Sequence, residues 1–309
     1  MSRYLIGRVG QAVVVLWAAF TASFILLQAL PGDAILIKFQ NPDLGLSPVQ
    51  IAEIRESYGA DSPVWAQYLH TLGNFLTGDF GYSVQAGVPV GDGLLANLPP
   101  TFRLAAFGFA LAVLLAVAIA ALSSLASFSW LRSVLQALPS LFVSVPTFWL
   151  GIMLIQLFSF RLKLIPVINP GPWEGLILPM VTLAIPISAP LAQILVRNID
   201  EVLTHPFVAV ARAKGASRAW VLWRHVARNA LLPTLTIAGV LSGELLAGAV
   251  ITETVFGWGG VGRYVVNAIQ GRDYIVVQNV ILIFAIIFLV VNLIVDVLYA
   301  FLNPRIRYS

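Results

Sequence analysis

The chain has 309 residues, of which 59% are hydrophobic and only 10% charged, and its mean hydropathy is +0.89. A typical soluble domain is about a quarter charged, so this composition excludes an ordinary soluble enzyme, a disordered chain and a nucleic-acid-binding protein. With no cysteine, the chain cannot form a disulfide framework, a cysteine-ligated metal site or a cysteine nucleophile. The three histidines, His70, His205 and His225, form no metal-ligand motif. We therefore expect neither a catalytic residue nor a bound metal.

Six apolar runs are each long enough to cross a bilayer as a helix, which takes about 20 residues. They cover residues 9–30, 104–126, 134–160, 176–196, 231–251 and 276–302. In lipid such runs must be helical, because each unpaired backbone group there costs several kcal/mol. Prolines within or beside the runs predict kinks. The sequence therefore predicts an all-α integral membrane protein with six transmembrane helices.

The basic residues predict the orientation of these helices. Eleven Lys and Arg residues fall on the side of both termini, and seven fall on the other side. Because cytoplasmic loops carry an excess of Lys and Arg, we expect both termini to be cytoplasmic. The first run is longer than the apolar core of a signal peptide and is expected to remain as an anchor. Two connections are long: an outer segment, residues 31–99, and an inner segment, residues 198–230.

Two short helices are expected in the outer segment. Ser47 and Gln50 form a capping box at the start of the first, which should end near Gly59. The second should begin after Pro63 with an apolar stripe that includes Trp65. This stripe has two interpretations that the sequence leaves open. The helix either lies at the level of the lipid headgroups or packs as a cap on the spans.

The inner segment is basic and apolar together, and it is expected to form two helices separated by a glycine. Pro206 can open the first helix, and Gly215 can end it in the left-handed conformation. Ser217 can cap a second helix running to Asn229. A loop of this kind on the cytoplasmic surface is suited to docking into a groove of a soluble partner.

The motifs of the chain, in order, resemble those of ABC-importer permeases in the dipeptide/oligopeptide/nickel branch, over nearly all of its length. The most specific is Arg-Ala-Lys-Gly-Ala-Ser at residues 212–217. The other matching motifs lie at residues 30–33, 78–83, 89–90, 98–101, 144–151, 253–258 and 260–262. The chain departs from the family's usual residues at Ala34, Ala209, Gly259 and Asn303.

The resemblance implies a role, partners and a location. The chain would be the first of two homologous permeases, residues 1–309 forming a single domain of the ABC type I importer fold in a bacterial inner membrane. Its partners would be the second permease, two cytoplasmic ATPases that use ATP and Mg, an extracytoplasmic binding protein, and lipid, but no nucleic acid. The sequence has no GxxxxGK[ST] phosphate loop, so we expect no ATP hydrolysis and no cofactor in this chain. Peptides, nickel complexes, glutathione and other small solutes are all compatible substrates.

Three groups of residues are candidates for these roles. For the loop that couples to the ATPase they are Ala209, Arg212, Ala213, Lys214, Gly215, Ala216 and Ser217, although the basic members also fit simple positive-inside charges. For the translocation pathway they are Glu244, Pro146, Phe148 and Trp149. For docking on the extracytoplasmic side they are Asp79, Tyr82, Glu253, Phe256 and Trp258.

Glu244 is the residue that the resemblance does not explain. It lies in the middle of a span, where an acidic residue costs about 2.5–3.5 kcal/mol and usually faces a cavity or a partner. It either lines the pathway or forms a structural pair. Together with Asp296 it also supports an alternative function, a secondary transporter or channel. We prefer the importer subunit, because the sequence shows no repeated halves of the kind common in secondary transporters.

Overall fold

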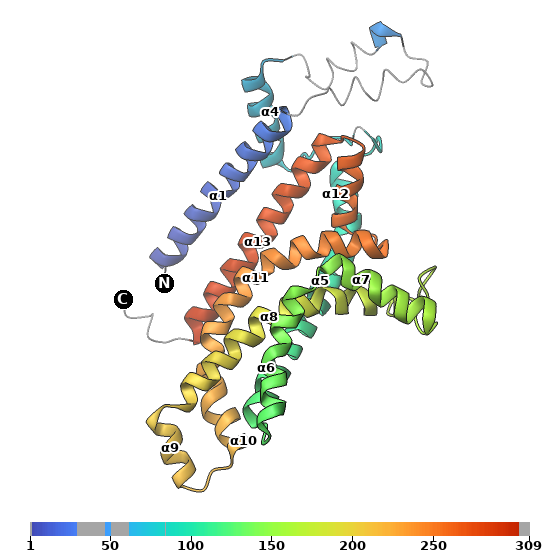
Figure 1. Ribbon diagram of the computed structural model, residues 1–309. Coiled ribbons are helices and arrows are strands. Elements are labelled where there is room, and N and C mark those ends of the chain that lie inside the picture. Colours follow the sequence, from blue (N-terminus) through green and yellow to red (C-terminus); the bar gives the residue numbers. More distant parts are fainter. Residues whose placement is uncertain (1, 30–46, 51–61, 84, 303–309) are drawn as a thin grey trace. The chain divides into compact units, whose positions relative to one another are not determined.

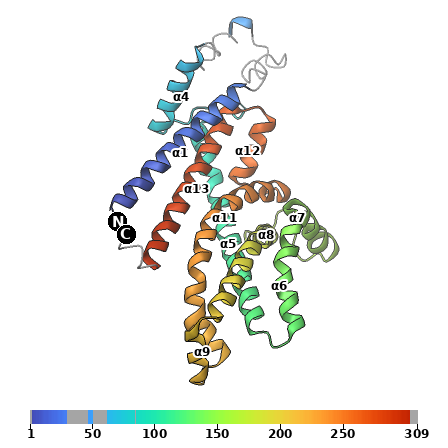
Figure 2. The ribbon, with the colours of Figure 1, turned by 60° about the vertical axis from the view of Figure 1, so that its left-hand side comes forward.

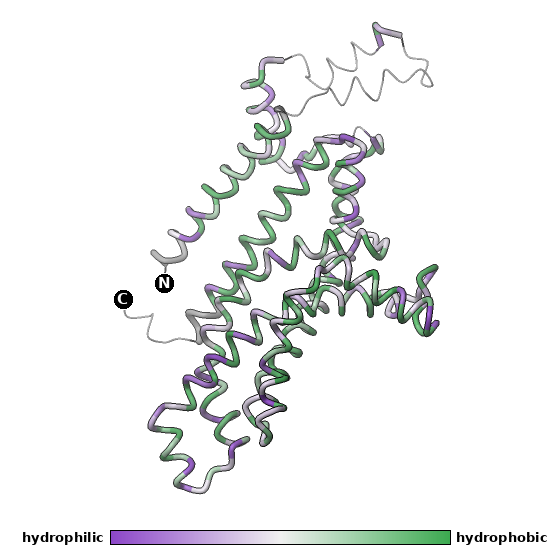
Figure 3. Tube along the Cα trace, in the orientation of Figure 1, coloured by the Kyte–Doolittle hydropathy of each residue, from purple (hydrophilic) through white to green (hydrophobic). Residues whose placement is uncertain are grey.

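The computed structural model describes residues 2–29, 47–50, 62–83 and 85–302, and this part of the chain is predominantly helical (Figure 1). Its long helices are α1 (Ser2–Ala29), α5 (Val90–Leu125), α8 (Glu174–Leu203), α11 (Ala227–Phe256) and α13 (Tyr274–Leu302). Each contains a stretch long and apolar enough to cross a membrane, and these stretches are mostly green in Figure 3. Five of the six predicted spans are therefore confirmed as long apolar helices.

The remaining predicted span, residues 134–160, is broken. Helix α6 (Ser129–Ser144) is followed by α7 (Thr147–Leu154) and a π-helical turn η2 (Ile155–Arg161), which are bent by 100° from α6. A proline disfavours the helical conformation of the residue before it, and Val145, which precedes Pro146, is extended with φ −93° and ψ 119°. The pair is either one broken span or a re-entrant loop, so the described residues contain five spans or six.

The shorter helices are α4 (Val64–Thr77), α9 (Pro206–Ala213), α10 (Arg218–Val221), the π-helical turn η3 (Leu222–Val226) and α12 (Val261–Gln270). The chain divides into two compact units. The first unit comprises residues 1–99 and 259–289, and the second comprises residues 100–258 and 290–309. Helices α5 and α13 each contribute residues to both units.

The core of the second unit lies between α5, α8 and α11. Leu183 of α8 is buried there, next to Gly108 of α5 and Gly248 of α11. A Cβ atom at either glycine would lie 2.9 Å from a methyl carbon of Leu183, which is closer than van der Waals contact allows. Small residues at such positions let transmembrane helices approach closely, and here they make room for one leucine from two sides.

The outer segment confirms two local predictions. The backbone N–H of Gln50 donates to Ser47 Oγ at 3.3 Å, and the backbone N–H of Ser47 donates to Gln50 Oε1 at 2.9 Å, which is the expected capping box. Helix α4 begins after Pro63, as predicted. The end expected at Gly59 lies outside the described residues, as do the motif at residues 30–33 and the departures Ala34 and Asn303.

Candidate functional site: the inner loop and its helices

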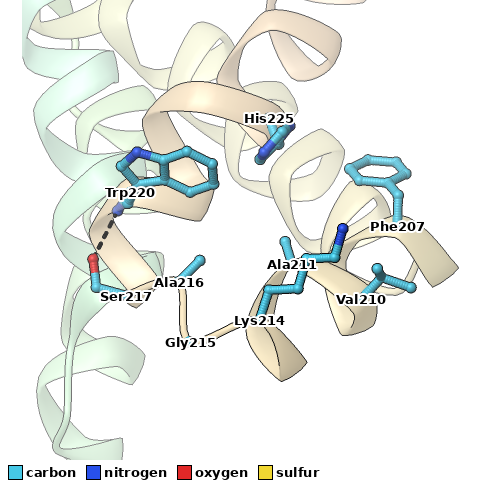
Figure 4. A pocket seen from close by; sticks show the side chains of 9 residues that line it. All are labelled: Phe207, Val210, Ala211, Lys214, Gly215, Ala216, Ser217, Trp220 and His225. Atoms are coloured by element: carbon cyan, nitrogen blue, oxygen red, sulfur yellow. Dashed lines mark hydrogen bonds between the residues drawn. The ribbon is translucent and has the colours of Figure 1, made fainter.

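The inner loop forms the predicted pair of helices around a glycine. Pro206 occupies the first turn of α9, and Gly215 has φ +85°, in the left-handed region that favours glycine. Ser217 caps α10, its Oγ accepting a hydrogen bond from the backbone N–H of Trp220 at 3.3 Å (Figure 4). Pro and Ser favour helix starts, and Gly favours the position after a helix end. The helix–glycine–helix pattern of the loop could therefore be predicted from local chemistry alone.

The second helix of the loop does not end at Asn229, contrary to expectation. Helix α10 continues through η3 into α11 without an interruption, and the backbone at Val221, Leu222, Val226 and Ala227 is helical. Since no glycine or proline occurs between Ser217 and Pro233, nothing in the sequence stops the helix there. The inner loop is therefore the direct extension of α11, one of the helices that are long and apolar enough to cross a membrane.

A hollow of about 720 Å³ lies between the two arms of the loop (Figure 4). Aromatic rings form much of its wall. The rings of Trp220 and His225 meet edge to face with their centroids 4.9 Å apart, and the ring centroids of Phe207 and His225 are 6.3 Å apart. The complete lining is Phe207, Val210, Ala211, Lys214, Gly215, Ala216, Ser217, Trp220 and His225. An apolar or aromatic side chain of a soluble partner fits such a wall better than a small charged group does.

The loop shares a hydrophobic core with the spans beside it. Val208 of α9 and Val221 of α10 are almost completely buried, and they pack with Leu195 and Ile199 of α8 and with Ala120 of α5. In addition, the side-chain amide of Asn198 in α8 donates to the carbonyl of Ala230 in α11 at 3.2 Å. The loop and the adjoining ends of these helices therefore form one packed core, and a close-packed core transmits strain.

The residues predicted for coupling lie mostly on the surface of this loop. The side chains of Ala209, Arg212, Ala213, Lys214 and Ser217 are exposed, and that of Ala216 is half-buried. The aromatic wall of Phe207, Trp220 and His225 was not singled out from the sequence. The sequence does contain a signal for this wall: several aromatic rings occur within one short basic segment. A loop surrounded only by water would not need them.

The four residues predicted for the pathway are exposed but are not gathered at one place. Phe148 and Trp149 are about half exposed on α7, whose Gly151 faces Val255 and Phe256 at the outer end of α11. Glu244 lies 11 residues before Val255, about 16 Å along the helix. It is exposed, whereas its neighbours Leu245 and Leu246 are buried, so α11 turns this carboxylate away from its core.

The residues predicted for extracytoplasmic docking fall into two groups. Asp79 and Tyr82, in the first unit, are exposed. In the second unit Glu253 is completely buried, and Phe256 and Trp258 are half-buried. The Trp258 indole N–H donates to the carbonyl of Pro100 at 3.2 Å, so this side chain is directed toward α5.

Two family patterns match the chain. Residues 108–308 match the family described as binding-protein-dependent transport system inner membrane component, and residues 1–105 match its N-terminal membrane component. The chain belongs to this family. Over all 309 residues, and over the full length of the relative, this permease is 34% identical to the glutathione transport system permease protein GsiC of Escherichia coli strain K12. The GsiC protein of Shigella boydii serotype 4 is 33% identical over the same length.

Solved structures agree on the fold. An amino acid ABC transporter crystallised with histidines has a TM-score of 0.54 and 18% identity, over 67% of this permease and 93% of that chain. The inward-facing MetNI methionine ABC transporter has a TM-score of 0.53 and 19% identity, over 69% and 95%. The family match confirms the predicted resemblance and the inner-membrane location, and the solved structures agree with the predicted all-α membrane fold. The protein is an ABC-importer permease that works with a second permease, ATPases and a substrate-binding protein.

Proposed function

We propose that this permease carries peptides or related small solutes, glutathione among them, from a binding protein into the cell. The full-length similarity to a glutathione permease supports this substrate class. In this proposal the chain catalyses nothing itself, and the ATP and Mg are held by the partner ATPases. Residues 1–309 act as one permease domain, with residues 31–99 outside and residues 198–230 in the cytoplasm. The alternative of a secondary transporter or channel using Glu244 and Asp296 is not retained, because it gives the binding protein no role.

One observation supports the coupling part of the proposal: the inner loop shares its core with three membrane helices. Val208 and Val221 pack against α5 and α8, and α10 continues into α11 through η3. An ATPase that binds the hollow between α9 and α10 would therefore move α8 and α11 directly. We infer that the residues 209 and 212–217 form the docking surface, with the rings of Phe207, Trp220 and His225 as its apolar wall.

The other candidate residues take separate roles in this proposal. Exposed Glu244, Pro146, Phe148 and Trp149 line the path of the substrate, and exposed Asp79 and Tyr82 receive the binding protein. Glu253, Phe256 and Trp258 contribute to docking by holding the outer end of α11 in place. The hydrogen bonds of Glu253 and Trp258 to α5 support this indirect role better than a direct contact with the binding protein.

The test is uptake by the complete importer in proteoliposomes, with radiolabelled glutathione and a labelled dipeptide, each added with the binding protein. Uptake of at least one of them should require enclosed ATP and Mg and should stop with a non-hydrolysable ATP analogue. It should persist when ionophores abolish all ion gradients. Uptake that is indifferent to ATP but lost with ionophores would contradict the coupling proposal. ATP-driven uptake of neither compound would contradict the substrate proposal.

A further inference from the structure

Helix α4 of the outer segment uses one side to pack on α1. The ring of Tyr68 meets Phe20 and Phe24 edge to face at 5.3 Å, and Phe75 lies 6.2 Å from Phe20. The hydroxyl groups of Tyr68 and Thr21 are hydrogen-bonded at 2.8 Å. Both ribbon views show α4 beside the end of α1 that leads into the outer segment (Figures 1 and 2).

These contacts place α4 within the depth of a membrane. Phe20, Thr21 and Phe24 belong to the apolar stretch Gly7–Leu27 of α1. Phe20 precedes Leu27 by seven residues, about 10 Å at the helical rise, in a hydrocarbon layer about 30 Å thick. Tyr68 lies against Phe20 and Phe24, so α4 packs on the part of α1 that lies in the outer half of this layer. With 14 residues, α4 is too short to cross the membrane.

A second side of α4 is apolar and exposed. Trp65, Leu69 and Leu76 are 68%, 57% and 76% exposed, and their spacing places them on one face. The polar residues lie on another side. The Gln67 side-chain amide donates to the carbonyl of Ser62 at 2.8 Å, and Asn74 Nδ2 lies 3.4 Å from His70 Nδ1. The helix contains no charged residue. It therefore has one face for α1, one apolar exposed face, and one polar face.

We propose that α4 is immersed in the outer leaflet beside α1, with Trp65, Leu69 and Leu76 in contact with lipid acyl chains and His70 facing water. The depth set by Phe20 favours lipid over water as the surroundings of the exposed stripe. The lack of any charged residue favours lipid over a polar protein surface, because charge near hydrocarbon is costly and is absent here. A tryptophan at the outer end of such a helix fits the interfacial level.

This arrangement would fix the outer segment to the membrane. The turn that follows α4 is bound to the start of α13 in the same unit: Ser83 Oγ donates to Asp273 Oδ2 at 2.6 Å, and the Asn279 amide donates to the carbonyl of Phe80 at 2.9 Å. Asp79 and Tyr82 lie in this turn. The outer leaflet would hold α4, and α13 would hold the turn. Together these contacts would keep the two exposed residues at a constant distance from the membrane surface.

The chain has no cysteine, so single spin labels can measure the depth of each face. The variants Leu69→Cys and Leu76→Cys probe the apolar stripe, and His70→Cys and Asn74→Cys are matched controls on the same helix. Each is labelled in the complete importer in phosphatidylcholine nanodiscs. Collision rates are then compared between oxygen, which concentrates in lipid, and a water-soluble nickel complex.

The proposal predicts that the labels at positions 69 and 76 collide several-fold more with oxygen than with the nickel complex, and that those at positions 70 and 74 show the reverse. Preferential collision with nickel at all four positions would overturn it and would leave α4 as a cap in water. Protection of positions 69 and 76 from both reagents would also overturn it, since a protein subunit would then cover the stripe. Since neither readout involves transport, the result is independent of the proposed substrate.

Discussion

The hydroxyl of Thr101 in α5 donates a hydrogen bond of 2.7 Å to the carboxylate of Glu253 in α11, and both side chains are buried. In a second hydrogen bond, the indole N–H of Trp258 donates to the carbonyl of Pro100, the residue that precedes Thr101. Together these bonds join the outer end of α11 to α5 within the second unit. A buried carboxylate is tolerated only when it is hydrogen-bonded, so Thr101 is part of what allows Glu253 to be there.

Replacing Thr101 by valine keeps the shape of the side chain but removes the donor. We expect Thr101→Val to destabilise the permease by about 1–3 kcal/mol, the usual cost of removing one hydrogen-bond donor from a buried polar group. Thr101→Ser keeps the hydroxyl and is the matched control, with a much smaller loss. The measurement is the melting temperature of the detergent-purified importer by fluorescence-detected size exclusion. Equal melting of the valine variant and the wild type would show that this bond contributes nothing.

Gly215 offers a test of coupling that is free of steric clash. A Cβ atom there would meet nothing within 4 Å, so the cost of a substitution comes only from φ +85°. A β-branched residue is strongly disfavoured at positive φ, whereas asparagine tolerates it. Gly215→Val should therefore abolish most ATP-driven uptake while the subunits still assemble, and Gly215→Asn should retain most of it. Uptake in proteoliposomes and co-purification of the ATPases measure the two effects. Normal uptake by the valine variant would refute the docking role of this turn.

Leu183 of α8 should limit how closely α5 and α11 can approach it. Because Gly108 and Gly248 each face one methyl group of Leu183, both contacts fall on a single side chain that cannot adjust to each of them independently. Each of Gly108→Ala and Gly248→Ala should overpack the site by about 1–3 kcal/mol, and the double variant should lose more than their sum. Adding Leu183→Ala to the double variant should restore part of the melting temperature. If the triple variant is the least stable, the leucine is not the group that the new methyls strike.

The parts of this permease that the sequence predicts correctly are those decided by local chemistry. Apolar length alone identifies the long helices, and Pro206, Gly215 and Ser217 locate the turn of the inner loop. The inward direction of Glu253 could not be predicted in this way, because its partner Thr101 is 152 residues away. For the same reason the proline at position 146 predicted a kink but not a bend of 100°, whose size depends on how α7 packs on α11.

Glu244 remains the residue whose role is most open to experiment. Its carboxylate is exposed on α11, beside buried Leu245 and Leu246. At mid-membrane, lipid would be a costly neighbour for such a group, whereas a hydrated path would not. An acidic group in that path would attract the ammonium end of a peptide without holding it, since a pathway must release what it admits. We therefore expect Glu244 to favour substrates with a positively charged end.

Glu244→Gln keeps the size of the side chain and removes its charge. It should reduce uptake of a peptide with a free amino terminus several-fold more than uptake of the same peptide with an acetylated one. Assembly and basal ATP hydrolysis should stay unchanged, because Glu244 lies outside the core that joins α11 to the inner loop. Both peptides must bind the binding protein equally, which is measured separately by calorimetry. An equal loss for both peptides, together with poor assembly, would show instead that the carboxylate pairs with the second permease. That outcome would take Glu244 out of the pathway, because a structural partner responds to loss of charge regardless of what is being carried.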